Sequence, residues 1–211
     1  GEMKTKPTQH SVMRLREIGL EPNLLVCRTE AEHHLTPKLK KKLGLFCNVE
    51  TTHVFESPDV ETIYEIPLVL NQQKFDDIII QKLGLKVRSH EVNLHILENC
   101  IGRYKHPKYT VTIAICGKYN SLHDAYKSII EAFIHSGIEN ETHVKVKWVD
   151  PEKLESGKKE DFIFQKVDGI LIPGGFGDRG IEGKILASQY ARENNIPFFG
   201  ICLGLQCAII D

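Results

Sequence analysis

Pro197-Phe-Phe-Gly-Ile-Cys-Leu-Gly-Leu-Gln206 places one cysteine, Cys202, between two apolar runs of different character. The first run, Ile196 to Ile201, is short, as is typical of a buried strand. The second run, Leu205 to Ile210, has a helix-like pattern. The sequence therefore predicts a strand, then a tight turn that exposes the thiol above the edge of a sheet, and then a helix.

Cys202 has surroundings that suit a nucleophile. Gly200 and Gly204 flank it. A thiol at a helix N-terminus meets the helix dipole and unpaired N–H groups, which favour the thiolate. Hydrolases place a catalytic serine on a similar strand–turn–helix, with oxygen in place of sulfur. The alternative is an inert buried cysteine, and this segment alone leaves both interpretations open.

The composition excludes several classes of protein. With 211 residues, the chain can form one large domain or two small ones. Its 27 Lys and Arg balance 28 Asp and Glu, which favours neither a nucleic-acid partner nor an acidic tail. We find no apolar run of about 18 residues and no signal peptide, so we expect no membrane partner.

The cysteines and the chain ends suggest the setting of the protein. Six cysteines without a CxxC pair indicate a reducing compartment, and we expect a cytoplasmic protein. The chain begins at Gly1 without an initiator Met and ends at Asp211 inside a helical pattern. We therefore expect an internal piece of a longer polypeptide.

Three regions follow from the pattern of strands and helices. Residues 1–85 alternate helix and strand signals, which favours an α/β arrangement. Residues 86–109 are mostly polar, with a short helical pattern that we expect Gly102 to break, and form an interdomain linker. Residues 110–211 alternate strands with helices, which predicts a parallel, doubly wound sheet. Within this region we expect a helix that stops at Gly137 and a polar loop over residues 151–161.

Two lysine-rich segments lie in the first region. Residues 4–9, Lys-Thr-Lys-Pro-Thr-Gln, precede a helical pattern, and we expect an extended loop that either cradles an anion or is simply solvated. Thr36-Pro37 predicts the start of a helix. On that helix Leu39, Leu43 and Phe46 are expected to share the apolar face, with the lysines on others. His33 and His34 are adjacent, which is poor spacing for a metal site, and we predict none.

A glycine-rich run, Pro173 to Gly180, follows a predicted strand. Gly175-Phe-Gly-Asp-Arg-Gly180 matches GxGxxG, but no acidic residue ends the next strand, which disfavours a nicotinamide site. A Walker A motif also fails, because Lys184 is followed by Ile185. The remaining interpretation is a loop of backbone donors for an oxyanion. The N–H of Leu203 and that of Gly174 or Gly175 are the expected donors.

These segments resemble two known families. Gly200 to Gln206 and Pro173 to Gly177 are similar to the nucleophile turn and oxyanion loop of class I glutamine amidotransferases. The N-terminal run Gly1 to Val12 resembles the UTP-binding segment of the CTP synthase family. Four further runs resemble signatures of that family: Leu45-Phe-Cys-Asn-Val49, Gly117-Lys-Tyr119, Asp124-Ala-Tyr-Lys-Ser128 and Gly177-Asp-Arg-Gly-Ile-Glu-Gly183.

The resemblance implies roles for individual residues. Cys202 would be the glutaminase nucleophile, and glutamine and its oxyanion would be held by Gly175, Leu203, Gly204, Leu205 and Gln206. UTP, and CTP as feedback inhibitor, would contact Lys4, Thr5, Lys6, Pro7, Thr8, Gln9, Lys42 and Phe46. The adenine of ATP would meet Pro58, Asp59 and Val60, although Pro58 replaces a residue that is often charged in the family. Lys127 and Arg179 match positions implicated in activation by GTP.

The resemblance also implies a fold and a reaction. The fold would be two incomplete α/β domains, a P-loop-type amidoligase part (1–85) and a flavodoxin-like amidotransferase part (110–211). ATP with Mg²⁺ would phosphorylate UTP, and ammonia from glutamine would displace the phosphate to give CTP, in a homotetramer. The phosphate loop and magnesium carboxylates would precede Gly1, and the triad His and Glu would follow Asp211, so we expect this piece to be inactive alone.

Two alternatives remain at this stage. One is a free-standing cysteine hydrolase with the same sheet topology, which has no use for residues 1–85. The other is a nucleotide-sensing module that retains an inactive amidotransferase fold. A His and Glu pair after Cys202 would distinguish the active enzyme from this module.

Overall fold

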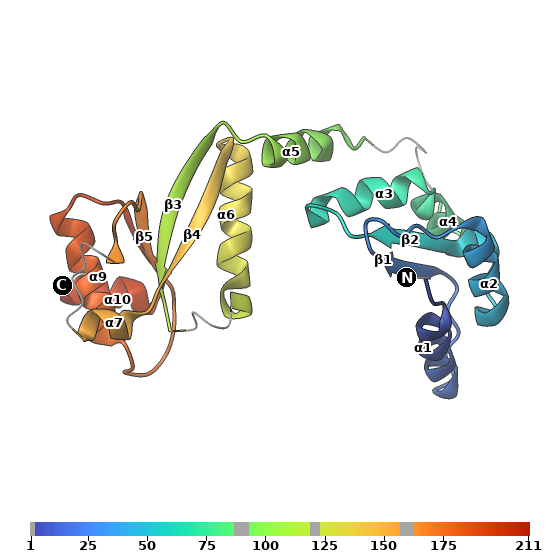
Figure 1. Ribbon diagram of the computed structural model, residues 1–211, viewed down its shortest axis with the longest axis horizontal. Helices are drawn as coiled ribbons and strands as arrows, with labels where there is room; N and C mark the ends of the chain where they lie inside the picture. The colour runs from blue at the N-terminus through green and yellow to red at the C-terminus, as the bar shows by residue number, and fades with distance from the viewer. Residues whose placement is uncertain (1–2, 87–92, 119–122, 157–162) are drawn as a thin grey trace. The chain divides into compact units, whose positions relative to one another are not determined.

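A computed structural model describes residues 3–86, 93–118, 123–156 and 163–211 (Figure 1). The chain divides into two compact units, Gly1–Ile101 and Gly102–Asp211. The point of division lies within helix α5 (His95–Lys105), inside the predicted linker. We describe each unit by itself.

Unit 1 is built on two parallel strands, β1 (Leu25–Thr29) and β2 (Val54–Pro58). Leu25 pairs with Val54 and Thr29 with Pro58, so both carboxyl ends meet at one edge. Its helices are α1 (Lys6–Glu17), α2 (Pro37–Cys47), α3 (Ile66–Gln72) and α4 (Phe75–Lys82), with 3₁₀ turns η1 (Thr51–His53) and η2 (Ile63–Glu65). The core comprises Val12, Leu25, Leu35, Leu43, Cys47 and Val54.

Helix α1 differs from the expected extended loop at its start. It begins at Lys6, so residues 6–9 form its first turn. Pro7 fits there because the first N–H groups of a helix need no partner within it, and proline lacks that group. Only Lys4 and Thr5 therefore precede the helix among the described residues of the predicted segment.

Helix α2 confirms the predicted start and corrects the predicted face. The hydroxyl of Thr36 accepts a hydrogen bond from the N–H of Leu39, and Pro37 occupies the first turn. Leu43 and Cys47, one turn apart, are buried, whereas Phe46 is 57% exposed. Phe46 was expected to share the apolar face with Leu39 and Leu43, but the buried face of α2 runs through Leu43, Gly44 and Cys47 instead.

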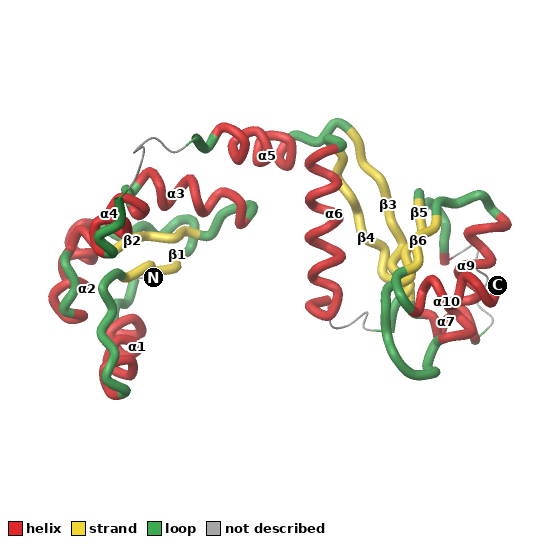
Figure 2. The backbone as a smooth tube through the Cα atoms, turned by 180° about the vertical axis from the view of Figure 1, so that it is seen from behind, coloured by secondary structure: helices red, strands yellow, loops and turns green. Residues whose placement is uncertain are grey.

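Unit 2 is a four-stranded parallel sheet with the order β4-β3-β5-β6. Its strands are β3 (Tyr109–Cys116), β4 (Thr142–Val149), β5 (Gly169–Ile172) and β6 (Phe198–Gly200). Its helices are the 3₁₀ turn η3 (His123–Tyr126), α6 (Lys127–Glu139), α7 (Pro151–Glu155), α9 (Ile181–Glu193) and α10 (Leu203–Ile210). Helix α6 lies on one side of the sheet, and α7, α9 and α10 lie on the other (Figures 1 and 2).

The strand order of unit 2 identifies its topology. Counted along the chain, the order is 2-1-3-4, which is the order of a flavodoxin-like sheet. The predicted parallel, doubly wound sheet is thus confirmed. Its core is apolar and lies mainly between the sheet and α7 and α9, with Ala114, Cys116, Val149, Leu154, Phe164, Ile170, Ile172, Ala187 and Ala191.

Two predicted helix ends, at Gly102 and Gly137, and the start of one predicted loop were wrong. Gly102 lies inside α5 and Gly137 inside α6. A Cβ on Gly137 would overlap the carbonyl oxygen of Thr142, so this glycine permits close packing of α6 rather than ending it. The first part of the expected loop, residues 151–155, is helix α7, because the carboxylate of Asp150 accepts from the N–H of Glu152 and starts that helix. Residues 157–161 of the expected loop lie outside the described residues.

Candidate functional site

Cys202 lies at the turn between β6 and α10, as the sequence predicted. It is the N-cap residue of α10, with φ 50° and ψ −104°, and its side chain is exposed. A residue with a side chain rarely adopts a positive φ, and such conformations occur where the surrounding structure imposes them. The turn therefore presents the thiol in the way that nucleophile turns of α/β hydrolases present serine.

The two flanking glycines permit this turn. A Cβ on Gly200 would lie 2.5 Å from the carbonyl carbon of Gly204. A Cβ on Gly204 would overlap the carbonyl oxygen of Ile172 on β5. Since these obstacles are backbone atoms, side chains at either position would push α10 away from the sheet. Both glycines are thus required by close backbone approach.

The glycine loop, which we define as residues 173–180 between β5 and α9, packs against this turn. A Cβ on Gly174 would lie 3.5 Å from the Cβ of Cys202, and one on Gly175 would lie 3.7 Å from a methyl carbon of Leu203. Leu203 is the first residue of α10, so its N–H has no acceptor within the helix. The glycine loop and the start of α10 thus pack together beside Cys202, and both segments carry backbone N–H groups of the kind that stabilise an oxyanion.

The other thiols of unit 2 are poorly suited to be nucleophiles. Burial raises the pKa of Cys116 to about 12. Burial also raises the pKa of Cys207, although the nearby ammonium of Lys184 opposes it. Both side chains are almost fully inaccessible, whereas that of Cys202 is exposed. Because the thiolate is the nucleophilic form, Cys202 is the thiol of this unit that suits covalent chemistry.

Two cationic side chains hold the glycine loop, and the sequence predicted a role for only one of them, Arg179. The ammonium of Lys118 donates to the carbonyl oxygens of Phe176 (2.8 Å) and Gly177 (3.0 Å). Arg179, which was predicted to take part in activation by GTP, forms an ion pair with the carboxylate of Glu152 on α7. The signal for Lys118 was its position directly after a strand, within a motif already noted as a family signature.

Lys184 on α9 is a second cation near the loop. Its side chain is 1% exposed, and its Nζ would lie 3.9 Å from a Cβ on Gly175. Burial lowers the pKa of Lys184, and the neighbouring ammonium of Lys118 lowers it further. An almost fully buried lysine is uncommon. The polar pattern of α9 offered no sign of it, because the neighbours of the ammonium, among them Cys116 and Cys207, lie elsewhere in the chain.

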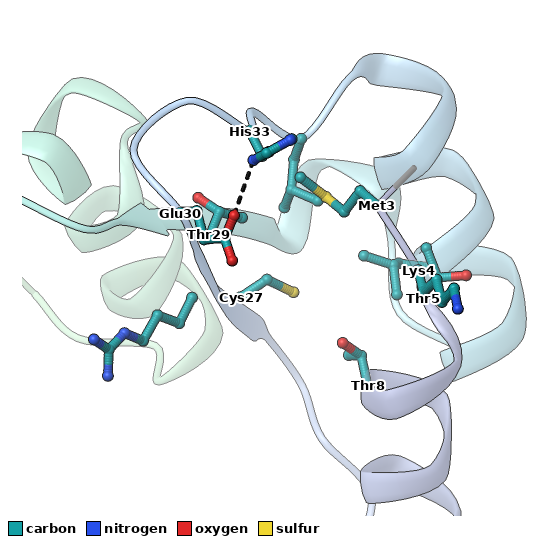
Figure 3. A pocket seen from close by; sticks show the side chains of 11 residues that line it. Met3, Lys4, Thr5, Thr8, Cys27, Thr29, Glu30 and His33 are labelled. Carbon is teal, nitrogen blue, oxygen red and sulfur yellow. Dashed lines mark ion pairs between the residues drawn. The ribbon is translucent and has the colours of Figure 1, made fainter. Parts of the chain in front are cut away.

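Unit 1 contains a cavity of about 400 Å³ between α1 and β1 (Figure 3). It is lined by Met3, Lys4, Thr5, Thr8, Cys27, Arg28, Thr29, Glu30, His33, Leu35 and Leu43. Of the predicted UTP residues, Lys4, Thr5 and Thr8 thus line it. The cavity combines hydroxyl groups and cations with an apolar floor, which suits a polar ligand that carries a negative charge.

The carboxyl end of β1 lines this cavity, and the carboxyl end of β2 pairs with it. Arg28 donates to the carboxylate of Asp59 at 2.8 Å, and the N–H of Asp59 donates to the carbonyl oxygen of Thr29. The predicted ATP segment, Pro58 to Val60, therefore begins beside Thr29, at the edge where parallel sheets bind ligands.

Glu56 on β2 joins this edge to the loop before α2. Burial alone would raise the pKa of Glu56, but hydrogen bonds from His34, Thr29 and the N–H of Leu35 outweigh it and lower that pKa. The carboxylate thus holds the residues around the cavity together in its charged form.

The remaining predicted residues do not line this cavity. Lys6, Pro7 and Gln9 lie in the first turn of α1, and Lys42 and Phe46 lie on exposed positions of α2. Lys127 begins α6 and is exposed. A smaller cavity in unit 2, of about 200 Å³, lies between α6 and β4 and does not include Cys202. The roles of these residues stay predictions.

Two searches were limited to the described residues. In residues 3–86, 93–118, 123–156 and 163–211, no three His, Cys, Asp or Glu side chains gather in a way that suits a metal ion. Over the same ranges, no helix has the length and apolar character that a membrane span needs.

Comparison with known proteins gives two family matches, one for each unit. Residues 1–85 match the model for the CTP synthase N-terminus, and residues 121–211 match that for class I glutamine amidotransferases. Over all 211 residues, the chain is 51% identical to the CTP synthase of Ruminiclostridium cellulolyticum. The chain belongs to the CTP synthase family.

Other members of the CTP synthase family are similarly close. The chain is 50% identical to the CTP synthase of Caldanaerobacter subterraneus subsp. tengcongensis over its whole length, and 51% identical to that of Cytophaga hutchinsonii over 210 residues. It spans 38–39% of the length of these relatives.

A solved structure also matches part of the chain. It is that of the Trypanosoma brucei CTPS glutaminase domain with bound acivicin, which is 43% identical with a TM-score of 0.45. The match covers 47% of this chain and 39% of that one.

Proposed function

We propose that the chain is part of a glutamine-hydrolysing CTP synthase, a ligase that forms a C–N bond in pyrimidine nucleotide synthesis. In this proposal ATP phosphorylates the 4-oxygen of UTP, and ammonia from glutamine displaces the phosphate. The products are CTP, ADP, phosphate and glutamate. The observation that carries the proposal is the exposed Cys202 on a turn with positive φ, packed against the glycine loop.

The glutamine half of the reaction belongs to unit 2. Cys202 attacks the side-chain amide, and the N–H groups of Leu203 and Gly175 receive the oxyanion. Gly204, Leu205 and Gln206 complete the proposed glutamine site. A base must take the thiol proton, and we expect a His and Glu pair outside residues 1–211 to do so, so that this chain alone lacks glutaminase activity.

The nucleotide half belongs to unit 1. We assign UTP, and CTP as its competitor, to the cavity lined by Lys4, Thr5 and Thr8. The other predicted UTP residues do not line this cavity, and we propose them as further contacts of the nucleotide. ATP, as its magnesium complex, is assigned to Pro58, Asp59 and Val60. The proximity of Asp59 to Thr29 supports this, because it brings the two nucleotide segments to one sheet edge.

Further parts of the proposal concern the whole enzyme. We propose residues 1–85 as the end of the amidoligase domain, 86–109 as the linker and 110–211 as the start of the amidotransferase domain. We propose that GTP activates the enzyme through Lys127 and Arg179. We also propose that the enzyme is a cytoplasmic homotetramer. A free-standing hydrolase would leave unexplained why residues 1–85 match the CTP synthase N-terminus.

Lys4→Ala in the full-length enzyme is expected to raise the KM for UTP about tenfold to a hundredfold, because a charge-assisted hydrogen bond to phosphate is lost. The kcat at saturating UTP should change little. The measurement is CTP formation from UTP, ATP and ammonium chloride, which bypasses glutamine. Lys38→Ala is the matched control, since Lys38 lies on α2 outside the cavity lining. An unchanged KM for UTP in Lys4→Ala would show that Lys4 is simply solvated and does not bind UTP.

A further inference from the structure

We infer that Lys118 is a positioning residue for glutamine hydrolysis, which acts by holding the glycine loop in the conformation that receives the oxyanion. The inference rests on the proposed glutaminase function. It assigns a role to a side chain that follows β3 and whose hydrogen bonds go to Phe176 and Gly177 rather than to the proposed nucleophile.

The contacts of Lys118 are directed at the backbone of the loop. Its ammonium donates to two successive carbonyl oxygens, those of Phe176 at 2.8 Å and Gly177 at 3.0 Å. Lys118 follows β3, and β5, which leads into the loop, pairs with β3. The half-buried lysine thus spans two neighbouring strand ends.

The loop has little side-chain packing of its own. Gly174, Gly175 and Gly177 have no side chains, and that of Phe176 is 94% exposed. Gly177 also adopts φ 77°, which glycine reaches without strain. Such a segment loses much conformational entropy when it is ordered. Two charge-assisted hydrogen bonds from one cation offset that loss where packing cannot.

The two hydrogen bonds from Lys118 lie next to the residues proposed to stabilise the oxyanion. The carbonyl groups that Lys118 holds belong to residues directly after Gly174 and Gly175, which pack on Cys202 and Leu203. Oxyanion stabilisation depends on N–H groups that already point at the developing charge. Without these two hydrogen bonds the loop would sample more conformations, and its N–H groups would point at the oxyanion less often.

The electrostatics around the loop support the same role. Arg179 pairs with Glu152, which fixes the far end of the loop to α7. The hydrogen bond from Arg179 lowers the pKa of Glu152, and the charge of Lys118 adds to this effect. Burial lowers the pKa of Lys184, and the like charge of Lys118 near the same loop lowers it further. Two cations at this place are suited to a reaction that develops negative charge there.

The test compares Lys118→Met with Lys118→Arg in the full-length enzyme. Lys118→Met keeps the length of the side chain and removes its donors, so we expect kcat of glutamine hydrolysis to fall about 10- to 100-fold. The KM for glutamine should change less than threefold, and the rate of Cys202 alkylation by iodoacetamide should stay within twofold. Lys118→Arg should recover at least part of kcat, because it can still donate to the carbonyl groups.

Two controls separate positioning from general stability. Lys147 donates to the carbonyl oxygen of Gln165 (3.1 Å), which is the same kind of bond away from the glycine loop, so Lys147→Met should leave kcat unchanged. Synthesis from ammonia should persist in Lys118→Met. Loss of that activity, an equal loss in Lys147→Met, or an unchanged kcat in Lys118→Met would each overturn the inference. Failure of the proposed function is distinguished by Cys202→Ala, which would then keep glutamine-driven activity.

Discussion

Cys202→Ala in the full-length enzyme is expected to reduce glutamine-driven CTP synthesis at least about 1,000-fold, because removal of a catalytic nucleophile leaves no covalent route. Synthesis from added ammonia should persist, since unit 2 takes no part in it under the proposed function. The measurement is CTP formation with glutamine or with ammonium chloride as nitrogen donor, together with glutamate release. This difference between glutamine-driven and ammonia-driven synthesis is the largest effect that we predict.

Cys100→Ala is the control for this substitution. Cys100 is a half-buried thiol on α5, outside both candidate sites, so its loss should leave both activities unchanged. Glutamine-driven synthesis that survives in Cys202→Ala would contradict the proposed function directly. Loss of the ammonia-driven activity as well would show that the substitution damages the fold. Cys202→Ser, which removes the thiol but keeps a side chain of similar size, would then test the role of the thiol.

Gly204→Ala should destabilise unit 2 by about 3 kcal/mol or more and abolish glutamine hydrolysis. Its Cβ would overlap the carbonyl oxygen of Ile172 and lie 2.9 Å from the Cβ of that residue. Neither the β5 backbone nor the start of α10 can move without disturbing the turn at Cys202. The measurements are the midpoint of thermal or urea unfolding and the glutaminase rate.

Gly102→Ala provides the contrast. Gly102 also lies in a helix, but a Cβ there would meet nothing within 4 Å. Because alanine favours helices over glycine, this change should be neutral or stabilise the protein by up to about 1 kcal/mol. Equal stability of Gly204→Ala and Gly102→Ala would disprove the close approach of α10 to β5.

Local signals predicted much of the fold. The start of α2 at Thr36-Pro37, the strand that precedes Pro173 and the turn at Cys202 were all predicted from the sequence, because each depends on neighbouring residues. The predictions that helices end at Gly102 and Gly137 were wrong because glycine weakens a helix only modestly. At Gly137 the close packing of α6 against the start of β4 also favours glycine, whereas a Cβ on Gly102 would meet nothing within 4 Å.

The candidate sites were predicted only in part. The thiol, its glycines and the glycine loop were recognised from their order along the chain. Lys4, Thr5 and Thr8 line a cavity, but its other walls, including Cys27 and His33, were not predicted. These residues carry no local pattern, and they come together only because β1 pairs with β2 and α1 packs beside it.

The turn at Cys202, the family of the chain and the parallel character of unit 2 follow from the sequence, since these depend on residues that are close along the chain or on motifs. The accessibility of each thiol, the exposure of Phe46 and the hydrogen bonds of Lys118 to the glycine loop depend on the folded chain instead. Separation along the chain explains this difference. Lys118 and Phe176 are 58 residues apart, and only the pairing of β3 with β5 brings an ammonium to that carbonyl oxygen.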